Sequence, residues 1–427
     1  MENFRIERLQ VAQIGPFRDI DISFNPKKEV DKAEIHILTG ENGTGKSTIL
    51  QCLSFPKFSS GEVIVNKFWT TKPLSSFTIQ YSVSSPPMKW YLNQGQLRSD
   101  HWGPILNEYN SKIGAESNMV EFEFIILAYS GYRQINDFKV TGIQEINDKP
   151  LYRANDFTNS INPQNLFQWL VNIQTRELIA KGKGDSQKAR QYRNTIEIIE
   201  NALGEIIESE VKFDLEEDPL GVKIKVDGQL LNFAQLADGL KSMVSWMGDL
   251  LMRMDRLKWV NDTPILERNF ILLLDEIEVH LHPAWQRKIL PVVQKLFKNA
   301  QIFISTHSPF VVGSVDGAWV HRFEKKDGYS VLAGPPILSE DANSYDYILE
   351  EIFGIKKRFG VEVEKKLSDF QKIKEEFISI QNEENSQKLR SIISELSGQS
   401  TELDSILGME LRQLKRLTNH DFSLTSV

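Results

Sequence analysis

The segment Gly40-Glu41-Asn42-Gly43-Thr44-Gly45-Lys46-Ser47 has the residue types and spacing of a phosphate-binding loop. Its glycines let backbone N–H groups turn toward a polyphosphate, and a helix that starts after the loop adds the positive end of its dipole. Lys46 can reach the terminal phosphate oxygens, and Ser47 can offer its hydroxyl to Mg²⁺. We expect the nucleotide contacts of this segment to come from Gly40, Asn42, Gly43, Gly45, Lys46, Ser47 and Thr48.

Two adjacent carboxylates, Asp275 and Glu276, follow the apolar run Phe270-Ile-Leu-Leu-Leu. Such a run is typical of a buried strand, so both carboxylates would stand at the end of that strand. There Asp275 can hold Mg²⁺ together with Ser47, and Glu276 can polarise a water aimed at the γ-phosphorus. An acidic strand end that only opens the next loop is the alternative interpretation. The phosphate loop earlier in the chain favours the catalytic one.

A third polar strand end, Ser305-Thr-His307-Ser308-Pro309, follows the apolar residues Ile302-Phe-Ile304. An isolated histidine at a strand end is more often structural. Here His307 follows the carboxylate strand by one predicted helix, so its imidazole can donate a hydrogen bond to the γ-phosphate. The expected catalytic residues are therefore Lys46, Glu276 and His307.

These motifs need alternating strands and helices to bring them together. Period-two apolar residues on both sides of Gly15-Pro16 predict a β-hairpin over residues 4–24. Strands are expected at 34–38, 270–274 and 301–305, and helices at 47–53, 240–256 and 285–297. Together they predict an α/β fold of the P-loop NTPase class.

The same patterns suggest four regions. The predicted regions are an N-terminal part of the ATPase core (1–160), a helical insertion (161–210), a second part of the core (211–335) and a helical C-terminal region (336–427). In the last region, apolar residues recur every three or four positions, as in amphipathic helices.

The segment Leu236-Ala237-Asp238-Gly239-Leu240-Lys241 resembles the Leu-Ser-Gly-Gly-Gln signature of ABC-type ATPases. With Asp275-Glu276-Ile-Glu-Val-His-Leu-His282-Pro283 and the His307 segment, it makes residues 1–320 similar to the SMC, RecF and OLD-related branch of AAA-family ATPases. The resemblance implies an ABC-ATPase-like mixed sheet with an N-terminal β-hairpin, a helical insertion and a C-terminal helical tail.

The resemblance also implies ATP and Mg²⁺ as ligands and a dimer in which two copies close head to tail. Ala237, Asp238 and Gly239 of one copy would then complete the phosphate site of the other. Ala237 stands where the family usually has Ser, and Asp238 where it has Gly, so hydrolysis is expected to be slow or to depend on a partner. Gln134, next to Arg133, would be the family's Mg²⁺-sensing glutamine.

The helical region and the preceding segment 345–354 resemble stand-alone ATPases that accompany a nuclease in anti-phage systems such as Septu, where the ATPase is called PtuA. This implies a sensor and scaffold that controls a separate effector, bound through the helical region. A cap on the ATPase core is the alternative role for these helices. Other functions stay open: a RecF-like DNA-repair ATPase that clamps DNA, a protein that holds ATP without turnover, and a transporter ATPase subunit.

Composition narrows these functions further. The 427 residues include 50 Lys and Arg against 58 Asp and Glu, a net charge of −8, so broad non-specific binding of nucleic acid is not expected and DNA contacts would be local. The single cysteine, Cys52, fits a reducing compartment, and we expect the cytoplasm. No apolar run is long enough to span a bilayer. His280 and His282 lack the companions of a metal site, and no Asp-x-Asp pair follows Ser308, as an OLD-type nuclease domain would need.

Overall fold

The computed structural model describes residues 4–55, 71–82, 87–93, 96–99, 108–109, 111–113, 120–131, 140, 142–157, 161–340, 343–355 and 357–422. The chain divides into two compact units, Met1–Phe353 and Gly354–Val427. The first unit extends beyond residue 336, because β15 (Ile337–Leu338) pairs with its central sheet and Ile348 and Ile352 belong to its core.

The first unit is built around a mixed sheet with the strand order β14-β13-β3-β12-β11-β7, with β15 paired to β13. Its remaining strands are β3 (Glu34–Gly40), β7 (Phe124–Tyr129), β11 (Asn269–Leu274), β12 (Ala300–Ser305), β13 (Trp319–Lys326) and β14 (Tyr329–Leu332). The five strands from β13 to β7 are parallel, whereas β14 is antiparallel to β13. Because β3, β12 and β11 are parallel neighbours, the three predicted motifs leave the sheet at one edge.

A second, antiparallel sheet has the order β2-β1-β4-β5-β6. Its strands are β1 (Ile6–Ile14), β2 (Phe17–Ser23), β4 (Thr71–Tyr81), β5 (Met88–Asn93) and β6 (Gln96–Ser99). β1 and β2 form the predicted N-terminal hairpin, with Val11 opposite Ile20 and Ile14 opposite Phe17. Alternate residues of both strands are buried, as the period-two pattern requires.

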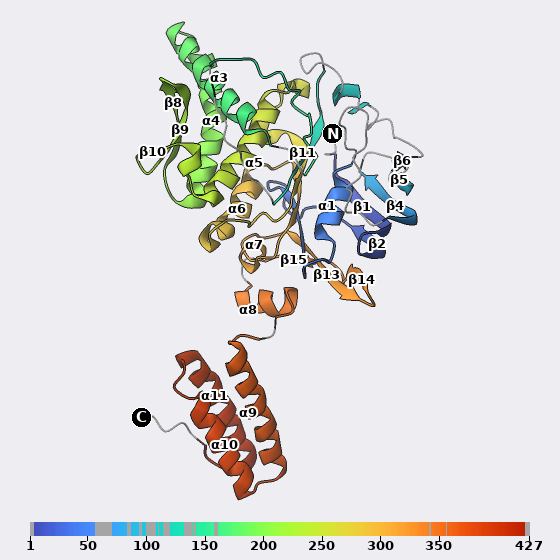
Figure 1. Cartoon of the computed structure of the whole chain (residues 1–427), viewed down its shortest axis with the longest axis vertical. Coiled ribbons are helices and arrows are strands. Elements are labelled where there is room, and N and C mark those ends of the chain that lie inside the picture. Colours follow the sequence, from blue (N-terminus) through green and yellow to red (C-terminus); the bar gives the residue numbers. More distant parts are fainter. Residues whose placement is uncertain are drawn as a thin grey trace. The chain divides into compact units, whose positions relative to one another are not determined.

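The predicted helical insertion consists of α3 (Pro163–Gly182) and α4 (Ser186–Ile207). Asn162 accepts a hydrogen bond from Gln164 N at the start of α3, and Asp185 accepts one from Lys188 N at the start of α4. A small sheet follows, with β8 (Val211–Glu217), β9 (Leu220–Val226) and β10 (Gln229–Leu231). Figure 1 shows these elements on one side of the central sheet and the antiparallel sheet on the other.

Helices cover the faces of the central sheet. The helix α1 (Lys46–Leu53) packs against β3, β11 and β12, while α5 (Asp238–Asp255) and α6 (Pro283–Leu296) pack against α4. The shorter elements are η1 (Phe233–Gln235), η2 (Val260–Asp262), η3 (Ile265–Glu267), α7 (Pro309–Val312), α8 (Tyr345–Tyr347) and the π-helical turn η4 (Ile348–Ile352). The mixed sheet, the insertion and the helical C-terminal region confirm the predicted fold class.

The second unit contains three helices, α9 (Val361–Ser379), α10 (Glu383–Leu396) and α11 (Thr401–Thr418). They enclose a core of their own, in which Phe370, Phe377, Leu389 and Leu407 are almost fully buried. Asn382 and Ser400 cap α10 and α11 by accepting hydrogen bonds from backbone N–H groups. In the part of the chain that the structure describes, no helix combines the length and the apolar character needed to cross a membrane.

Candidate nucleotide-binding site

The phosphate loop runs from the end of β3 to the start of α1, and close packing requires two of its glycines. A Cβ atom on Gly40 would lie 2.3 Å from the carbonyl oxygen of Phe323, and one on Gly45 would lie 2.5 Å from the ring of Phe17. Both glycines have positive φ angles, 145° and 89°, which other residues rarely adopt. Glycine therefore lets the loop curve tightly here. Phe17 itself is buried as a core side chain.

Lys46 is the buried cation of this loop. Its Nζ donates hydrogen bonds to the carbonyl oxygens of Gly40, at 2.9 Å, and Glu41, at 3.0 Å, which holds the ammonium group above the loop. Burial lowers the pKa of Lys46, and the charges of Asp275 and Glu276 oppose this shift. A cation beside the start of a helix is suited to a polyphosphate, since both favour negative charge.

Asp275 lies at the end of β11, and hydroxyl groups from two other elements hold its carboxylate. Ser47 Oγ donates to Asp275 Oδ1 at 3.1 Å from the first turn of α1, and Ser305 Oγ, at the end of β12, donates to the same oxygen. The structure therefore brings Ser47 and Asp275 together. Ser305 was not singled out from the sequence; its position at the start of the His307 segment was the available signal.

Glu276 turns away from the sheet with its side chain exposed. Its φ of 47° is unusual for a residue other than glycine, and its N–H donates to Ser305 Oγ at 2.8 Å. Gly131, which follows β7, lies so close that a Cβ atom there would come within 2.8 Å of Glu276 Cβ. The turn at the end of β11 is thus fixed by two neighbouring strands, and it presents the Glu276 carboxylate at the same edge as the phosphate loop.

His307 follows β12 and is partly buried. Burial lowers its pKa, and the positive charge of Lys46 lowers it further, so the imidazole is neutral at pH 7 and has one N–H to donate. Its backbone N–H donates to Glu278 Oε1 at 2.5 Å. Burial raises the pKa of the Glu278 carboxyl. Sequence reasoning missed Glu278, because a single glutamate in a loop carries no signal of burial.

The signature-like segment lies at the start of α5, which begins at Asp238 inside the segment. Ala237 and Asp238 are exposed, and Asp238 pairs with Lys241 at 3.1 Å. Gly239 lies against the loop after Glu276, since a Cβ atom there would come within 2.6 Å of the carbonyl oxygen of His280. Among residues that the structure describes, no hydrogen bond or ion pair joins this segment to the phosphate loop of the same chain.

The other predicted site residues have varied surroundings. Asn42 is exposed, and Thr48 packs beside Gly15, where a Cβ atom would lie 3.4 Å from Thr48 Oγ1. Gln134 and Arg133 lie outside the described residues.

The two histidines and the cysteine that the sequence set aside have structural surroundings. His282 accepts a hydrogen bond from Ala284 N at the start of α6, and His280 is exposed. Within the described ranges, no group of three or more His, Cys, Asp or Glu side chains could hold a metal ion. Cys52 is fully buried, which agrees with a packing role.

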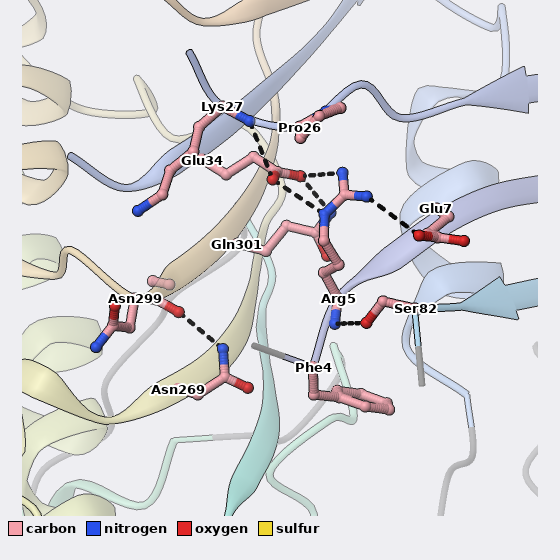
Figure 2. Close-up of a pocket in the computed structure, with 11 residues that line it drawn as sticks. Phe4, Arg5, Glu7, Pro26, Lys27, Glu34, Ser82, Asn269, Asn299 and Gln301 are labelled. Carbon is pink, nitrogen blue, oxygen red and sulfur yellow. Dashed lines mark hydrogen bonds and ion pairs between the residues drawn. The ribbon is translucent and has the colours of Figure 1, made fainter. Parts of the chain in front are cut away.

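The opposite edge of the sheet, where its parallel strands begin, contains a pocket of about 350 Å³. Figure 2 shows its lining: Phe4, Arg5, Glu7, Pro26, Lys27, Glu34, Ser82, Asn269, Asn299, Ala300 and Gln301. The Glu34 carboxylate accepts hydrogen bonds from Arg5, at 2.8 and 3.1 Å, and from Gln301 Nε2, at 2.6 Å. Lys27 Nζ donates to three backbone carbonyl oxygens. These side chains mainly bond to one another and to the backbone.

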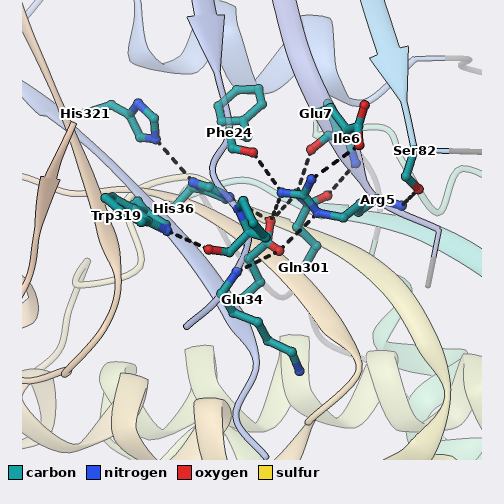
Figure 3. Close-up of polar contacts among 12 residues, drawn as sticks. Arg5, Ile6, Glu7, Phe24, Glu34, His36, Ser82, Gln301, Trp319 and His321 are labelled. Atoms are coloured by element: carbon teal, nitrogen blue, oxygen red, sulfur yellow. Dashed lines mark hydrogen bonds and ion pairs between the residues drawn. The ribbon is translucent and has the colours of Figure 1, made fainter. Parts of the chain in front are cut away.

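A chain of buried side chains continues from Glu34 into the sheet (Figure 3). His36 Nε2 lies 2.9 Å from Glu34 Oε1, and His36 Nδ1 lies 3.2 Å from His321 Nε2. Burial alone would raise the pKa of Glu34, but hydrogen bonds and charges from His36 and Arg5 lower it to about 2. Burial lowers the pKa of both histidines. None of these residues was predicted as functional, and their mutual pairing fits a structural role.

Comparisons with known proteins agree with the phosphate-loop geometry. Residues 8–61 match the family described as "AAA domain", and residues 183–313 match "AAA domain, putative AbiEii toxin, Type IV TA system". The chain is 27% identical over 278 residues to "Retron Ec83 probable ATPase" of Escherichia coli, covering 64% of this chain and 49% of that protein. It is 22% identical over 310 residues to "Septu protein PtuA" of Bacillus thuringiensis, covering 72% of each.

The chain thus spans about half the length of the retron relative. Among solved structures, it is similar to an SMC head bound to the C-terminal winged-helix domain of ScpA, with a TM-score of 0.45 and 15% identity over 79% of this chain and 98% of that one. The matched AAA domains contain the phosphate loop, Asp275 and His307. Residues 8–61 and 183–313 thus match AAA domains, and the chain is similar in sequence to a retron ATPase and to Septu protein PtuA.

Proposed function

We propose that this protein binds ATP with Mg²⁺ at the phosphate loop and hydrolyses it at a site that a second copy of the chain completes. The position of Ala237 and Asp238 carries this proposal. Both are exposed at the start of α5, and neither bonds to the phosphate loop of its own chain within the described residues. A segment that resembles the ABC signature has a function at the phosphates only if another copy supplies it. This supports a head-to-tail dimer.

The phosphate loop and its neighbours fit a magnesium nucleotide. Gly40, Gly43 and Gly45 shape a loop whose buried cation is Lys46. Ser47 and Asp275 place oxygen atoms 3.1 Å apart from two different elements, and oxygen ligands of this kind are those that Mg²⁺ prefers. These two residues, with Gln134, would hold the ion, and a bound Mg²⁺ would offset the negative charge of the phosphates.

The surroundings of Glu276 and His307 support their proposed roles in hydrolysis. The exposed Glu276 carboxylate can accept a proton from an attacking water, and the neutral His307 can donate a hydrogen bond to the γ-phosphate. Asp275 would serve as a metal ligand, because Ser47 and Ser305 both donate to its Oδ1 atom and hold it in place. The two adjacent carboxylates thus take different roles.

The signature-like segment supports slow or conditional turnover. Ala237 lacks the hydroxyl that the usual Ser would offer to a γ-phosphate, and Asp238 brings a carboxylate near the phosphates of the other copy. A carboxylate close to the phosphates repels their negative charge and so weakens nucleotide binding. Hydrolysis that depends on a partner is suited to a protein whose nucleotide state reports a signal. It is less suited to a protein that consumes ATP continuously.

The similarity to Septu and retron proteins supports a role as sensor and scaffold in an anti-phage complex with a separate effector. We propose that the effector is a nuclease that docks on the helical unit of residues 357–422, which has its own core and carries none of the nucleotide motifs. The net charge of −8 gives no support to broad DNA binding. The single cysteine of the chain, the buried Cys52, fits a protein of the cytoplasm.

Light scattering of the Glu276→Gln protein tests the ATPase dimer. With ATP and Mg²⁺, this variant should accumulate as a nucleotide-bound dimer, because it binds ATP but does not cleave it. Without nucleotide, or with the additional Lys46→Ala change, the mass should be that of the unliganded protein.

Ala237→Arg in the Glu276→Gln protein is the matched control for the signature. It should still bind ATP, measured by calorimetry, but it should no longer dimerise when ATP is added. An ATP-dependent dimer that forms equally well with Arg at position 237 would contradict the head-to-tail arrangement.

A further inference from the structure

The strand β13 carries a lysine to the rim of the phosphate loop. β13 runs parallel to β3, with Arg322 beside Thr39 and Phe323 beside Gly40. At Gly40 the strand β3 ends and the phosphate loop begins, whereas β13 continues to Lys326. The extra residues therefore stand beside the loop. The Nζ atom of Lys325 lies 3.4 Å from the point that a Cβ atom of Gly43 would occupy.

Packing fixes the backbone of this strand end. Lys325 lies opposite Ser330 of β14, and the Ser330 N–H donates to the carbonyl oxygen of Pro16 at 2.9 Å, in the turn between β1 and β2. The rings of Phe323 and Phe17 meet edge to face, with centroids 6.2 Å apart. β14 also packs against β2, as can be followed in Figure 1. These contacts set the position of the Lys325 backbone relative to the loop.

Lys325 has no anionic partner in the described chain. Its side chain is exposed, and no ion pair or hydrogen bond joins it to another described residue. Gly43, which it approaches, offers no charge. Exposed lysines without a partner are common, so exposure alone carries nothing. The location beside a polyphosphate loop distinguishes Lys325 from other exposed lysines.

The charges of the site leave room for a second cation. Asp275, Glu276 and Glu278 all act electrostatically on Lys46, the loop's own buried cation. ATP with Mg²⁺ adds further net negative charge. Lys46 alone would face this combination, with two of its hydrogen bonds already donated to Gly40 and Glu41. A cation on the opposite side of the loop would lower the cost of placing a triphosphate beside these carboxylates.

We propose that Lys325 is a second phosphate-binding cation, which reaches over Gly43 and contacts the phosphates of the bound nucleotide. This inference rests on the proposed function, since it assigns a further binding residue to the same site. Lys325 does not take part in the proposed proton transfer, so its effect should fall on nucleotide affinity rather than on the rate of cleavage at saturation.

Calorimetric titration with ATP and Mg²⁺ in the Glu276→Gln protein, which should not turn over, tests this role. Lys325→Ala should weaken ATP binding about fivefold at low salt, as expected for one partly solvated charge contact. The difference in affinity between this variant and the parent protein should shrink in 0.5 M salt. Lys325→Arg should bind within about twofold of the parent protein. The adjacent Lys326→Ala is the matched control, because it removes the same charge from the opposite side of the strand; it should change affinity less than about twofold.

Equal affinities for Lys325→Ala and Lys326→Ala would overturn the proposal, whether both match the parent protein or both are weaker. Failure of the proposed function gives a different result. If the parent protein itself takes up no ATP, the nucleotide site is wrong. If the parent protein binds ATP and Lys325→Ala binds it equally well, only the role of Lys325 is wrong.

Discussion

The two edges of the parallel sheet use charged side chains in opposite ways. At the edge where the strands begin, Glu34 is buried and accepts hydrogen bonds from Arg5, His36 and Gln301. At the edge where they end, Glu276 is exposed on a left-handed turn. A carboxylate whose bonds are all made inside the protein stabilises the fold, whereas one held open toward solvent is available for chemistry. The comparison teaches that burial and pairing, and not residue type, separate structure from function here.

The largest expected effect tests the open edge. Glu276→Gln should lower ATP hydrolysis about 10³-fold, near 4 kcal/mol in the barrier, because the amide cannot accept a proton from water. The free energy of unfolding should change by less than about 0.5 kcal/mol, since the side chain is exposed. Phosphate release and chemical denaturation measure the two quantities. Glu324→Gln, another exposed carboxylate on β13, should leave both unchanged, and wild-type turnover in Glu276→Gln would remove Glu276 from its role.

The next effect tests the buried edge. Glu34→Ala should lower the free energy of unfolding by about 3 kcal/mol, because the partly buried Arg5 would lose its closest carboxylate and keep only the more distant Glu7. ATP hydrolysis per folded molecule should stay within about twofold of the wild-type rate. Glu34 lies at the start of β3, and the phosphate loop follows the other end of that strand. Denaturant unfolding with a parallel phosphate-release assay separates these outcomes.

Two further variants keep the Glu34 result interpretable. Glu34→Gln, which retains one acceptor oxygen, should lose less stability and provides folded protein if the alanine variant does not fold. Glu29→Ala, an exposed carboxylate nearby, should be neutral. Loss of activity without loss of stability in either Glu34 variant would mean that the buried edge takes part in function.

Ser305 connects both behaviours and should give an intermediate effect. Its hydroxyl donates to Asp275 and accepts from the Glu276 N–H, so it orients both carboxylates of the open edge although it is itself buried. Ser305→Ala should lower hydrolysis about tenfold and the free energy of unfolding by about 1 kcal/mol. Ser314→Ala, which removes a local hydroxyl contact with Val311, should not change the rate. An unchanged rate in Ser305→Ala would show that Asp275 and Glu276 do not need this support.

Much of the open edge could be predicted from sequence, because its residues follow apolar strands directly. Gly40, Asp275 and His307 each stand at or just after a strand end, and three parallel neighbours must release their chains at one edge. Ser305 and Glu278 escaped prediction, since their importance depends on which side chain lies across from them. Lys325 was missed for the same reason, because nothing in its own segment shows that β13 extends further than β3.

The buried edge could not be predicted at all. Glu34 and His36 alternate in a strand that reads as a short apolar run, and their partners Gln301 and His321 are hundreds of residues away in sequence. Pairing at that separation follows from strand order, which propensity and periodicity do not specify. The division into two units has the same origin, because the short β15 joins the sheet through its pairing with β13 and not through any feature of its own two residues.

The last expected effect is a change in how the free energy of unfolding depends on pH, and it tests the buried edge. Burial lowers the pKa of His321 below its usual 6.5, so the folded protein holds it neutral while the unfolded chain takes up a proton below that pH. Stability is therefore full above pH 6.5 and falls as the pH drops from there. His321→Gln should make this decline shallower by up to about 1.4 kcal/mol per pH unit between pH 6.5 and 5, measured by denaturant unfolding at several pH values. His280→Asn changes an exposed histidine at the open edge, and it should leave the slope as it is. An unchanged slope in His321→Gln would mean that His321 accepts a proton within the folded protein.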